Sequence, residues 1–194
     1  MQSIRKVVGG LGNIMFKQAY LVGQVLDKKI PDVYVQSDKY WNQHADVIRA
    51  MYSEGIGSID KVALHIRRGD YVNNKFYVDL WKTDYYQRAL ALFPKDNFIV
   101  FCKDNQGWDT DKADRQWCRD NLTPILGDRY ELAPKENTEW EDMNLMASCK
   151  AIIGANSSFS WWACYLGKGE KIMPLAWYSD GINRTDCPPE WKRL

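Results

Sequence analysis

Several features that mark whole classes of protein are missing from this 194-residue sequence. No apolar run is as long as a membrane span, and the first residues lack the charged start and apolar core of a secretory signal. An excess of charge is also missing, because 26 Lys and Arg residues face 25 Asp and Glu residues, giving a formal net charge of +1. We therefore expect a soluble, cytoplasmic chain without a transmembrane segment, which binds no nucleic acid and recognises any anion through a local site.

Paired cysteines are missing as well. The five cysteines are odd in number, unevenly spaced and without a C-x-x-C pair. This pattern argues against a zinc site and a full disulfide framework, and it favours a reducing compartment. The cysteines are Cys102, Cys118, Cys149, Cys164 and Cys187.

Aromatic residues, by contrast, are abundant, with nine Trp and eleven Tyr. Several lie in polar or loop-like stretches, where a ring either stacks on a sugar or closes a small core. Both interpretations stay open at this point. The residues are Trp41, Trp81, Tyr85, Tyr86, Trp177 and Trp191.

Short apolar runs alternate with segments of helical length along most of the chain. The alternation predicts an α/β fold with Rossmann-like parallel sheets, followed by a loop-rich tail. The expected strands are 4–8, 32–36, 58–66, 97–102, 129–132, 150–154 and 170–174, the expected helices are 14–27, 39–53, 84–93, 109–121, 137–149 and the end of 155–166, and the tail is 175–194.

The most informative segment is 65–71, which reads His-Ile-Arg-Arg-Gly-Asp-Tyr and directly follows an apolar run. In open α/β sheets, ligands bind at the carboxyl ends of the strands. An Arg at that point offers a planar fork of donors suited to phosphate, and a nearby Asp can hold the fork in place. Two simpler interpretations are a surface salt bridge and an Arg-Gly-Asp adhesion motif.

Two further turns carry groups that bind anions. Residues 9–13 read Gly-Gly-Leu-Gly-Asn between an expected strand and an expected helix, and residues 156–162 read Asn-Ser-Ser-Phe-Ser-Trp-Trp at the start of another helix. Backbone N–H groups at such turns meet phosphates in many proteins. A tight turn that needs glycine, and ordinary helix capping, are the simpler explanations. Three such turns in one small chain are more than chance would produce.

An acidic pattern is present at Asp109-Thr110-Asp111. This D-x-D spacing occurs in sugar transferases that hold a divalent metal on a nucleotide diphosphate. It also lies at an expected helix start, where acidic side chains are favoured by the helix dipole. We expect the second explanation and no metal site.

Taken together, these segments resemble the galactoside α-1,2-fucosyltransferase family, GDP-fucose-dependent enzymes of GT-B architecture with two Rossmann-like halves. Residues 65–71 fit the family motif H-x-R-R-x-D-Y completely. Residues 9–16 fit its G-G-L-G-N-Q-M-F motif except that Ile14 replaces Gln, and residues 156–162 fit its N-S-S-F-S-W-W motif. The motifs occur in the family's order and extend over nearly the whole chain.

The resemblance implies a role for individual residues. Arg67 would bind the diphosphate of GDP-fucose, Asp70 would orient the site arginines, and Asn13 would face the sugar or the leaving oxygen. The expected catalytic residues are therefore Arg67, Asp70 and Asn13. The expected substrate-binding residues are His65, Arg68, Gly10, Gly12, Asp104, Asn156, Ser157, Ser158 and Phe159, with Asp104 close to guanosine.

The resemblance also implies a reaction, the inverting and metal-independent transfer of L-fucose from GDP-fucose to a hydroxyl of a galactose-containing glycan. No cofactor other than this donor substrate is expected. Because the 65–71 motif comes early in the chain, we expect a shortened N-terminal half on the acceptor side at 1–57 and a GDP-sugar-binding half at 58–194.

Three alternatives remain open. The first is another GDP-sugar or another acceptor within the same enzyme class. The second is a non-catalytic nucleotide- or glycan-binding module, and the third is a metal-dependent transferase that uses Asp109 and Asp111. The general base and the oligomeric state are not indicated by the sequence.

Overall fold

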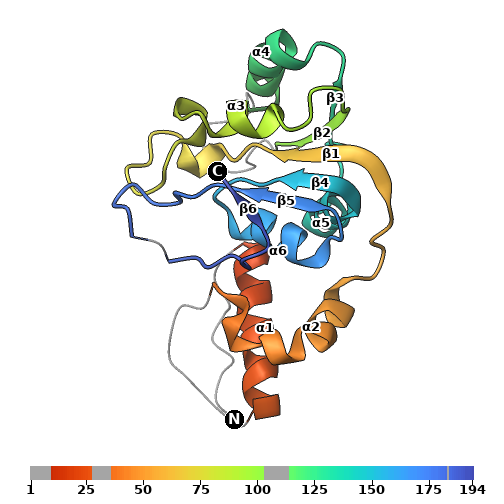
Figure 1. Cartoon of the computed structure of the whole chain (residues 1–194), viewed down its shortest axis with the longest axis vertical. Coiled ribbons are helices and arrows are strands. Elements are labelled where there is room, and N and C mark those ends of the chain that lie inside the picture. Colours follow the sequence, from red (N-terminus) through yellow and green to blue (C-terminus); the bar gives the residue numbers. More distant parts are fainter. Residues whose placement is uncertain (1–9, 28–35, 103–113, 183) are drawn as a thin grey trace.

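A single sheet of six parallel strands forms the centre of the computed structural model, which describes residues 10–27, 36–102, 114–182 and 184–194 (Figure 1). The order across the sheet is β3-β2-β1-β4-β5-β6, and every neighbouring pair is parallel. The predicted α/β class with a Rossmann-like parallel sheet is confirmed. The strands are β1 Ile59–His65, β2 Phe98–Phe101, β3 Tyr130–Leu132, β4 Cys149–Ile153, β5 Glu170–Met173 and β6 Lys192–Arg193.

The strand order determines where a ligand can bind. From β1 the chain builds outward in one direction through β2 and β3, and then returns to the other side of β1 with β4. At such a switch point the connections leave in opposite directions and open a crevice at the carboxyl ends of the two strands. The 65–71 motif starts at the last residue of β1, and the 156–162 motif follows shortly after β4 ends at Ile153.

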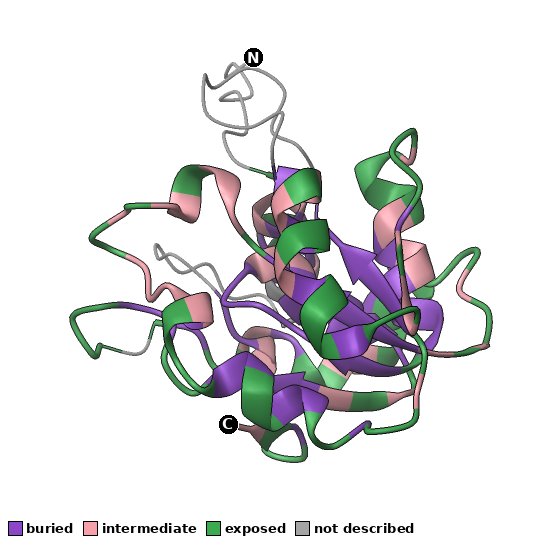
Figure 2. Ribbon diagram, turned by 90° about the horizontal axis from the view of Figure 1, so that it is seen from above, coloured by how far each residue is buried: buried purple, intermediate pink, exposed green. Residues whose placement is uncertain are grey.

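Helices cover both faces of the sheet, so the central strands are buried on both sides (Figures 1 and 2). This explains why β2 and most of β1 and β4 are continuous apolar runs. On one face lie α5 Glu139–Ser148 and α6 Ser158–Leu166, and α1 Leu11–Asp27 and α2 Ala45–Tyr52 pack on α6. The other face is covered by α3 Tyr85–Leu90 and α4 Asp114–Leu126.

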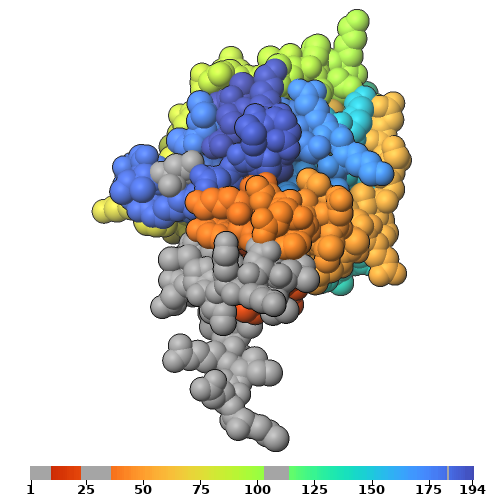
Figure 3. Space-filling model, turned by 60° about the horizontal axis from the view of Figure 1, so that its bottom comes forward, coloured from red at the N-terminus to blue at the C-terminus, as the bar shows by residue number. Residues whose placement is uncertain are grey.

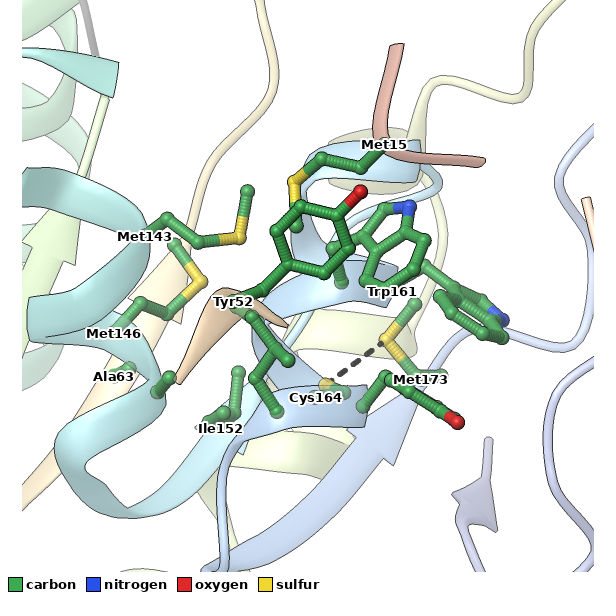
Figure 4. Packing of buried hydrophobic residues seen from close by; sticks show 14 of the residues in the cluster. Met15, Tyr52, Ala63, Met143, Met146, Ile152, Trp161, Cys164 and Met173 are labelled. Atoms are coloured by element: carbon green, nitrogen blue, oxygen red, sulfur yellow. Dashed lines mark hydrogen bonds between the residues drawn. The ribbon is translucent and has the colours of Figure 1, made fainter. Parts of the chain in front are cut away.

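The larger of the two cores is dominated by aromatic rings and methionines (Figure 4). Phe16 of α1 lies 4.6 Å from Trp161 of α6 between ring centroids, and Trp41 stacks on Trp162 with an interplanar angle of 6°. Most aromatic residues singled out from the sequence belong to these cores, so the sugar-stacking interpretation is wrong for them. The buried residues of that set are Trp41, Tyr85, Tyr86, Trp177 and Trp191, while Trp81 is half-buried against the second core.

The first turns of α1 and α6 touch each other at Gly12. A Cβ added to Gly12 would lie 2.7 Å from the backbone carbonyl carbon of Ser158 and 2.8 Å from the backbone nitrogen of Phe159. No side chain fits in that space. Glycine at this position therefore lets the two helix N-termini meet beside the switch point.

The N-terminal residues join the same core as the rest of the chain. Met15, Phe16, Ile48 and Tyr52 pack with α6, and residues 36–57 lie against the C-terminal residues (Figure 3). One bond of this contact is the Asp186 backbone N–H donating to Gln36 O at 3.1 Å. The expected division at residue 57 stays a prediction.

Element boundaries differ from the prediction in a few places. The expected helix at 39–53 is two short 3-10 helices, Asp38–Tyr40 and Asn42–His44, followed by α2. The tail forms the short strand β6, and Leu175 N–H donates to Leu194 O at 2.8 Å, so both ends of this loop are attached to the sheet. The expected strand 4–8, nearly all of 32–36 and the start of helix 109–121 lie outside the described residues.

None of the helices in the described ranges combines the length and the apolar character that crossing a membrane requires.

A buried histidine joins β1 to α6. His65 Nδ1 shares a hydrogen bond with Ser160 Oγ, which also accepts from the Ala155 backbone N–H at 3.0 Å. Burial, helped by the nearby Arg67 charge, lowers the pKa of His65 from 6.5 to about 3. The imidazole is therefore uncharged at neutral pH.

We predict that Gly12→Ala destabilises the protein, because the added methyl group must push the two helix N-termini apart. The overpacking costs about 1–3 kcal/mol, which outweighs the gain in helix propensity. Gly10→Ala is the matched control, since a Cβ there meets nothing within 4 Å. Urea unfolding of both variants measures the difference, and a Gly12→Ala variant as stable as Gly10→Ala would contradict the close contact.

We also predict that His65 makes the fold sensitive to acid. Below pH 6.5 the unfolded chain binds a proton at His65 and the folded chain does not, so stability falls as the pH decreases toward 3. Between pH 7 and pH 5 this loss amounts to about 2 kcal/mol. Urea unfolding at the two pH values should show a smaller loss for His65→Gln than for wild type and for His44→Gln, the matched control. Equal losses in all three would refute the assignment.

Candidate functional site

A cleft of about 260 Å³ lies at the switch point, slightly below the usual range for small-molecule sites. Its lining comes from all three segments that the sequence singled out, although they are far apart in the chain. The three segments therefore share one cleft. The predicted site residues that line it are Gly10, Gly12, Asn13, His65, Arg67, Asp70, Ser157, Ser158 and Phe159.

Two helix N-termini supply one wall of the cleft. Ser157 caps α6, and its hydroxyl accepts from the Phe159 backbone N–H at 3.3 Å. The first turn of α1 lies against this helix start through Gly12. Unpaired N–H groups and the aligned peptide dipoles make both helix starts favourable for an anion. At the start of α1, Asn13 Oδ1 accepts from Gln36 Nε2 at 3.0 Å.

Arg67 is the cation of the cleft, and two neighbours hold it. Its Nη2 lies 2.5 Å from Asp70 Oδ1, and its guanidinium lies 5.0 Å from the ring centre of Tyr71. The side chain is 41% exposed, so this ion pair adds little stability but orients the fork. Nη1 and Nε have no partner in the described part of the chain and can donate to a ligand.

Arg68 does not line the cleft. Its Nε donates to Asp114 Oδ1 at 2.9 Å, and its guanidinium lies 3.8 Å from the ring centre of Trp117, so it points toward α4. Asp114 also accepts from the Gly69 backbone N–H at 2.8 Å. The geometry gives Arg68 a supporting role, anchoring the 67–69 turn to α4, and lends no support to the expected substrate contact.

Asn156 likewise supports the site from behind. Its side-chain nitrogen donates to Val78 O at 2.9 Å and to Trp177 O at 3.0 Å, and the residue is buried. Its amide donors are therefore engaged by two loops and do not face the cleft, contrary to the expected substrate contact.

Uncharged groups line part of the cleft beside Arg67. The Ser160 hydroxyl accepts from Ala155, so its own proton is available to His65 Nδ1, which favours the tautomer with hydrogen on Nε2. Contact with Cys118 and burial raise the pKa of Cys102 far above its usual range. Burial does the same for the pKa of Tyr71. The Cys102 thiol is thus no nucleophile, and all five cysteines are free.

Seven residues of the cleft were not predicted as site residues, and Leu11, Phe101 and Cys102 of this set add mainly apolar surface. Glu139 and Asp142 come from the first turn of α5, and Tyr71 and Tyr77 come from the loop after β1. The sequence predicted a helix at 137–149 but no site role for its first turn, and α5 has a capping box between Thr138 and Glu141. The strand order could have predicted Glu139 and Asp142, because a helix that directly follows β3 begins at the carboxyl edge of the sheet, where the cleft lies.

The acidic motifs of the 103–113 segment cannot be placed. Asp104, Asp109 and Asp111 lie outside the described residues. Within the ranges that are described, no three His, Cys, Asp or Glu side chains come close enough together to hold a metal ion.

A second hollow, of about 610 Å³, lies between α3 and α4. It is larger than the cleft, but its lining is mainly apolar and Arg129 is its one charged residue among those described. It lacks the converging polar groups that a charged ligand needs. We therefore take the smaller cleft as the functional site.

Comparison with known proteins agrees with this geometry. The chain is 30% identical to an alpha-1,2-colitosyltransferase of Escherichia coli over 82% of the chain and 60% of that protein. It is also 30% identical to the O-antigen biosynthesis glycosyltransferase WbnK of Escherichia coli, over 63% of the chain and 40% of that protein. For the human galactoside alpha-(1,2)-fucosyltransferase 1 the identity is 28%, over 57% of the chain and 30% of that protein.

The chain thus spans 60% or less of the length of these relatives, and no solved structure matches it significantly. The model of the family described as glycosyl transferase family 11 matches residues 10–193. This match includes the cleft and all but one residue of the three motifs that build it. The chain belongs to glycosyl transferase family 11.

Proposed function

We propose that this protein transfers L-fucose from GDP-fucose to a hydroxyl of a galactose-containing glycan, forming an α-1,2 linkage with inversion and without a metal ion. The observation that carries the proposal is the convergence of Arg67 with the N-termini of α1 and α6 on one cleft. Family membership and the names of the relatives support a glycosyl transfer of this type.

On the donor side, the reaction breaks the bond between fucose C1 and the β-phosphate oxygen. Negative charge develops on that oxygen as GDP leaves, so preorganised donors and a cation lower the barrier. Arg67 supplies the cation, and the first turns of α1 and α6 supply N–H groups and the Ser158 hydroxyl. In this proposal these groups do the work that a divalent metal does in other transferases.

On the acceptor side, a base must take the proton of the attacking hydroxyl. His65 suits this role poorly, because its Nδ1 is engaged by Ser160 and its Nε2 carries the hydrogen in the favoured tautomer. Carboxylates at the cleft are better placed to accept a proton, and they belong to Asp70, Glu139 and Asp142. We propose His65 as a donor to the nucleotide-sugar and one of these carboxylates as the base.

A second candidate keeps the site and changes the sugar. The alpha-1,2-colitosyltransferase matches more of the chain than WbnK or the human fucosyltransferase does, and its name specifies colitose. A third candidate is a module that binds nucleotide or glycan without turnover, which the short span relative to the relatives suggests.

A transfer assay with galactose-terminated acceptors and a panel of GDP-sugars, with and without EDTA, separates these candidates. We expect product from GDP-fucose, at the same rate in EDTA. Product from GDP-colitose alone would establish the second candidate, and GDP binding without product from any donor would establish the third. Loss of transfer in EDTA, restored by Mn²⁺ and removed by Asp109→Asn, would show metal dependence instead.

We predict that Arg67→Ala lowers kcat by about 10²–10³-fold, because the leaving phosphate loses its main cationic partner. Arg67→Lys should recover only part of the rate, since a lysine lacks the planar fork. Arg88→Ala, which removes an exposed arginine from α3, is the matched control and should behave as wild type. Near-normal turnover of Arg67→Ala, with GDP affinity measured by calorimetry in parallel, would overturn the mechanism.

A further inference from the structure

A continuous set of aromatic rings extends from the cleft to the protein surface; we call it the aromatic rim (Tyr71, Phe76, Tyr77 and Tyr178). Tyr71 and Tyr77 line the cleft and are stacked, with centroids 4.0 Å apart and planes 9° from parallel. Phe76 meets Tyr77 edge-on at 5.1 Å, and this ring is 47% exposed. Phe side chains are usually buried, and an exposed phenyl ring next to a cleft is typical of a surface that binds a ligand or partner.

The aromatic rim begins at Arg67, the cation of the cleft. The guanidinium of Arg67 lies over Tyr71, and Tyr77 is stacked on the same ring. A sugar that reacts at a phosphate held by Arg67 must be approached by its acceptor from an adjoining surface. The rim is such a surface, since two of its rings share the cleft with Arg67.

The rim is also built to keep its shape, although most of it lies in loops. The chain segments 76–79 and 177–179 run side by side (Figure 1) and are joined by a bridge between Tyr77 and Tyr178. Val78 N–H donates to Trp177 O at 3.1 Å, and Ser179 N–H donates to Phe76 O at 3.0 Å. Rigid aromatic rings bind with little loss of side-chain entropy.

Asn156 is the buried group that holds the two segments together. Its side-chain nitrogen donates to both Val78 O and Trp177 O, and its backbone carbonyl oxygen accepts from the Tyr71 hydroxyl at 3.2 Å. One residue of the α6 turn therefore fixes the rim relative to the helix N-terminus of the cleft. This makes Asn156 a positioning residue for the rim.

Polar groups are present at the outer end of the rim. Arg184 lies 5.3 Å from the ring centre of Phe76 and 4.9 Å from that of Tyr178, and it pairs with Asp180 at 2.6 Å. Exposed aromatic faces pack on the C–H face of a pyranose ring, while guanidinium and carboxylate groups bind its hydroxyls. Galactose, whose axial hydroxyl leaves one face largely apolar, suits such a combination.

We propose that the aromatic rim is the acceptor subsite and that it binds a terminal galactose-type pyranose by stacking on the exposed ring of Phe76, next to Tyr77. This inference rests on the proposed transfer of a sugar to a galactose-containing acceptor and adds the surface that recognises this acceptor. It assigns the donor to Arg67 and the helix N-termini, and the acceptor to the loops that carry Phe76 and Tyr178, which differs from the acceptor side expected at residues 1–57.

Three variants test the subsite. Phe76→Ala removes the exposed ring, Phe76→Leu keeps apolar volume without a ring and serves if the first variant fails to fold, and Phe76→Tyr restores the ring. Ile125→Ala is the matched control, since Ile125 is equally exposed but lies on α4 at the second hollow. Two measurements are made on each variant: saturation-transfer NMR with methyl β-galactoside in the presence of GDP, and steady-state kinetics with GDP-fucose.

We expect Phe76→Ala and Phe76→Leu to raise the KM for the galactoside about five- to tenfold and to weaken the saturation-transfer signal. The KM for GDP-fucose and the rate of its hydrolysis without acceptor should stay unchanged, and Phe76→Tyr and Ile125→Ala should match wild type. An unchanged KM for the galactoside in both Phe76 variants would overturn the subsite, as would a parallel rise in both KM values.

The NMR arm separates this inference from the proposed function. If wild type shows no turnover of GDP-fucose but gives a galactoside signal that Phe76→Leu weakens, the donor assignment fails and the rim remains a galactoside site. If wild type turns over GDP-fucose yet gives no galactoside signal, the rim proposal fails and the donor assignment remains.

Discussion

The contact between Gly12 and the first turn of α6 is the constraint on which the site depends. Because position 12 has no Cβ, two helices that are distant in sequence begin side by side, and both helix N-termini line the cleft at the switch point of the sheet. The aromatic core behind this contact, with Phe16 packed on Trp161, keeps the helices in that arrangement. The wall that the two helix N-termini form is therefore a product of close packing, in a chain whose net charge is only +1.

Within one motif, some residues line the cleft and their neighbours anchor the surrounding turns. Arg67 faces the cleft and Arg68 points away from it to Asp114, so two adjacent arginines serve opposite sides of the same turn. In the same way, Ser158 lines the cleft while Asn156 ties loops together beneath it. A motif can therefore be needed for function as a whole although only some of its side chains reach the ligand.

Much of this could be predicted from the sequence, because the signals were local. The strand β2 and most of β1 and β4 are continuous apolar runs, and the glycine and serine turns indicate where helices begin. The two-residue strand β6 was not predicted, since it is too short to show any periodicity. The placement of Arg68, Glu139 and Asp142 depends on contacts between distant segments, which no local pattern encodes.

The attachment of the C-terminal loop at both of its ends has a consequence for how such proteins diversify. The loop leaves the sheet after β5 and returns to it as β6, so its two ends remain neighbours whatever lies between them. Lengthening a loop with fixed ends costs little closure entropy. Insertions beyond Ser179 can therefore accumulate during evolution while β5 and β6 keep their register, so the surface beside the cleft can change without disturbing the sheet.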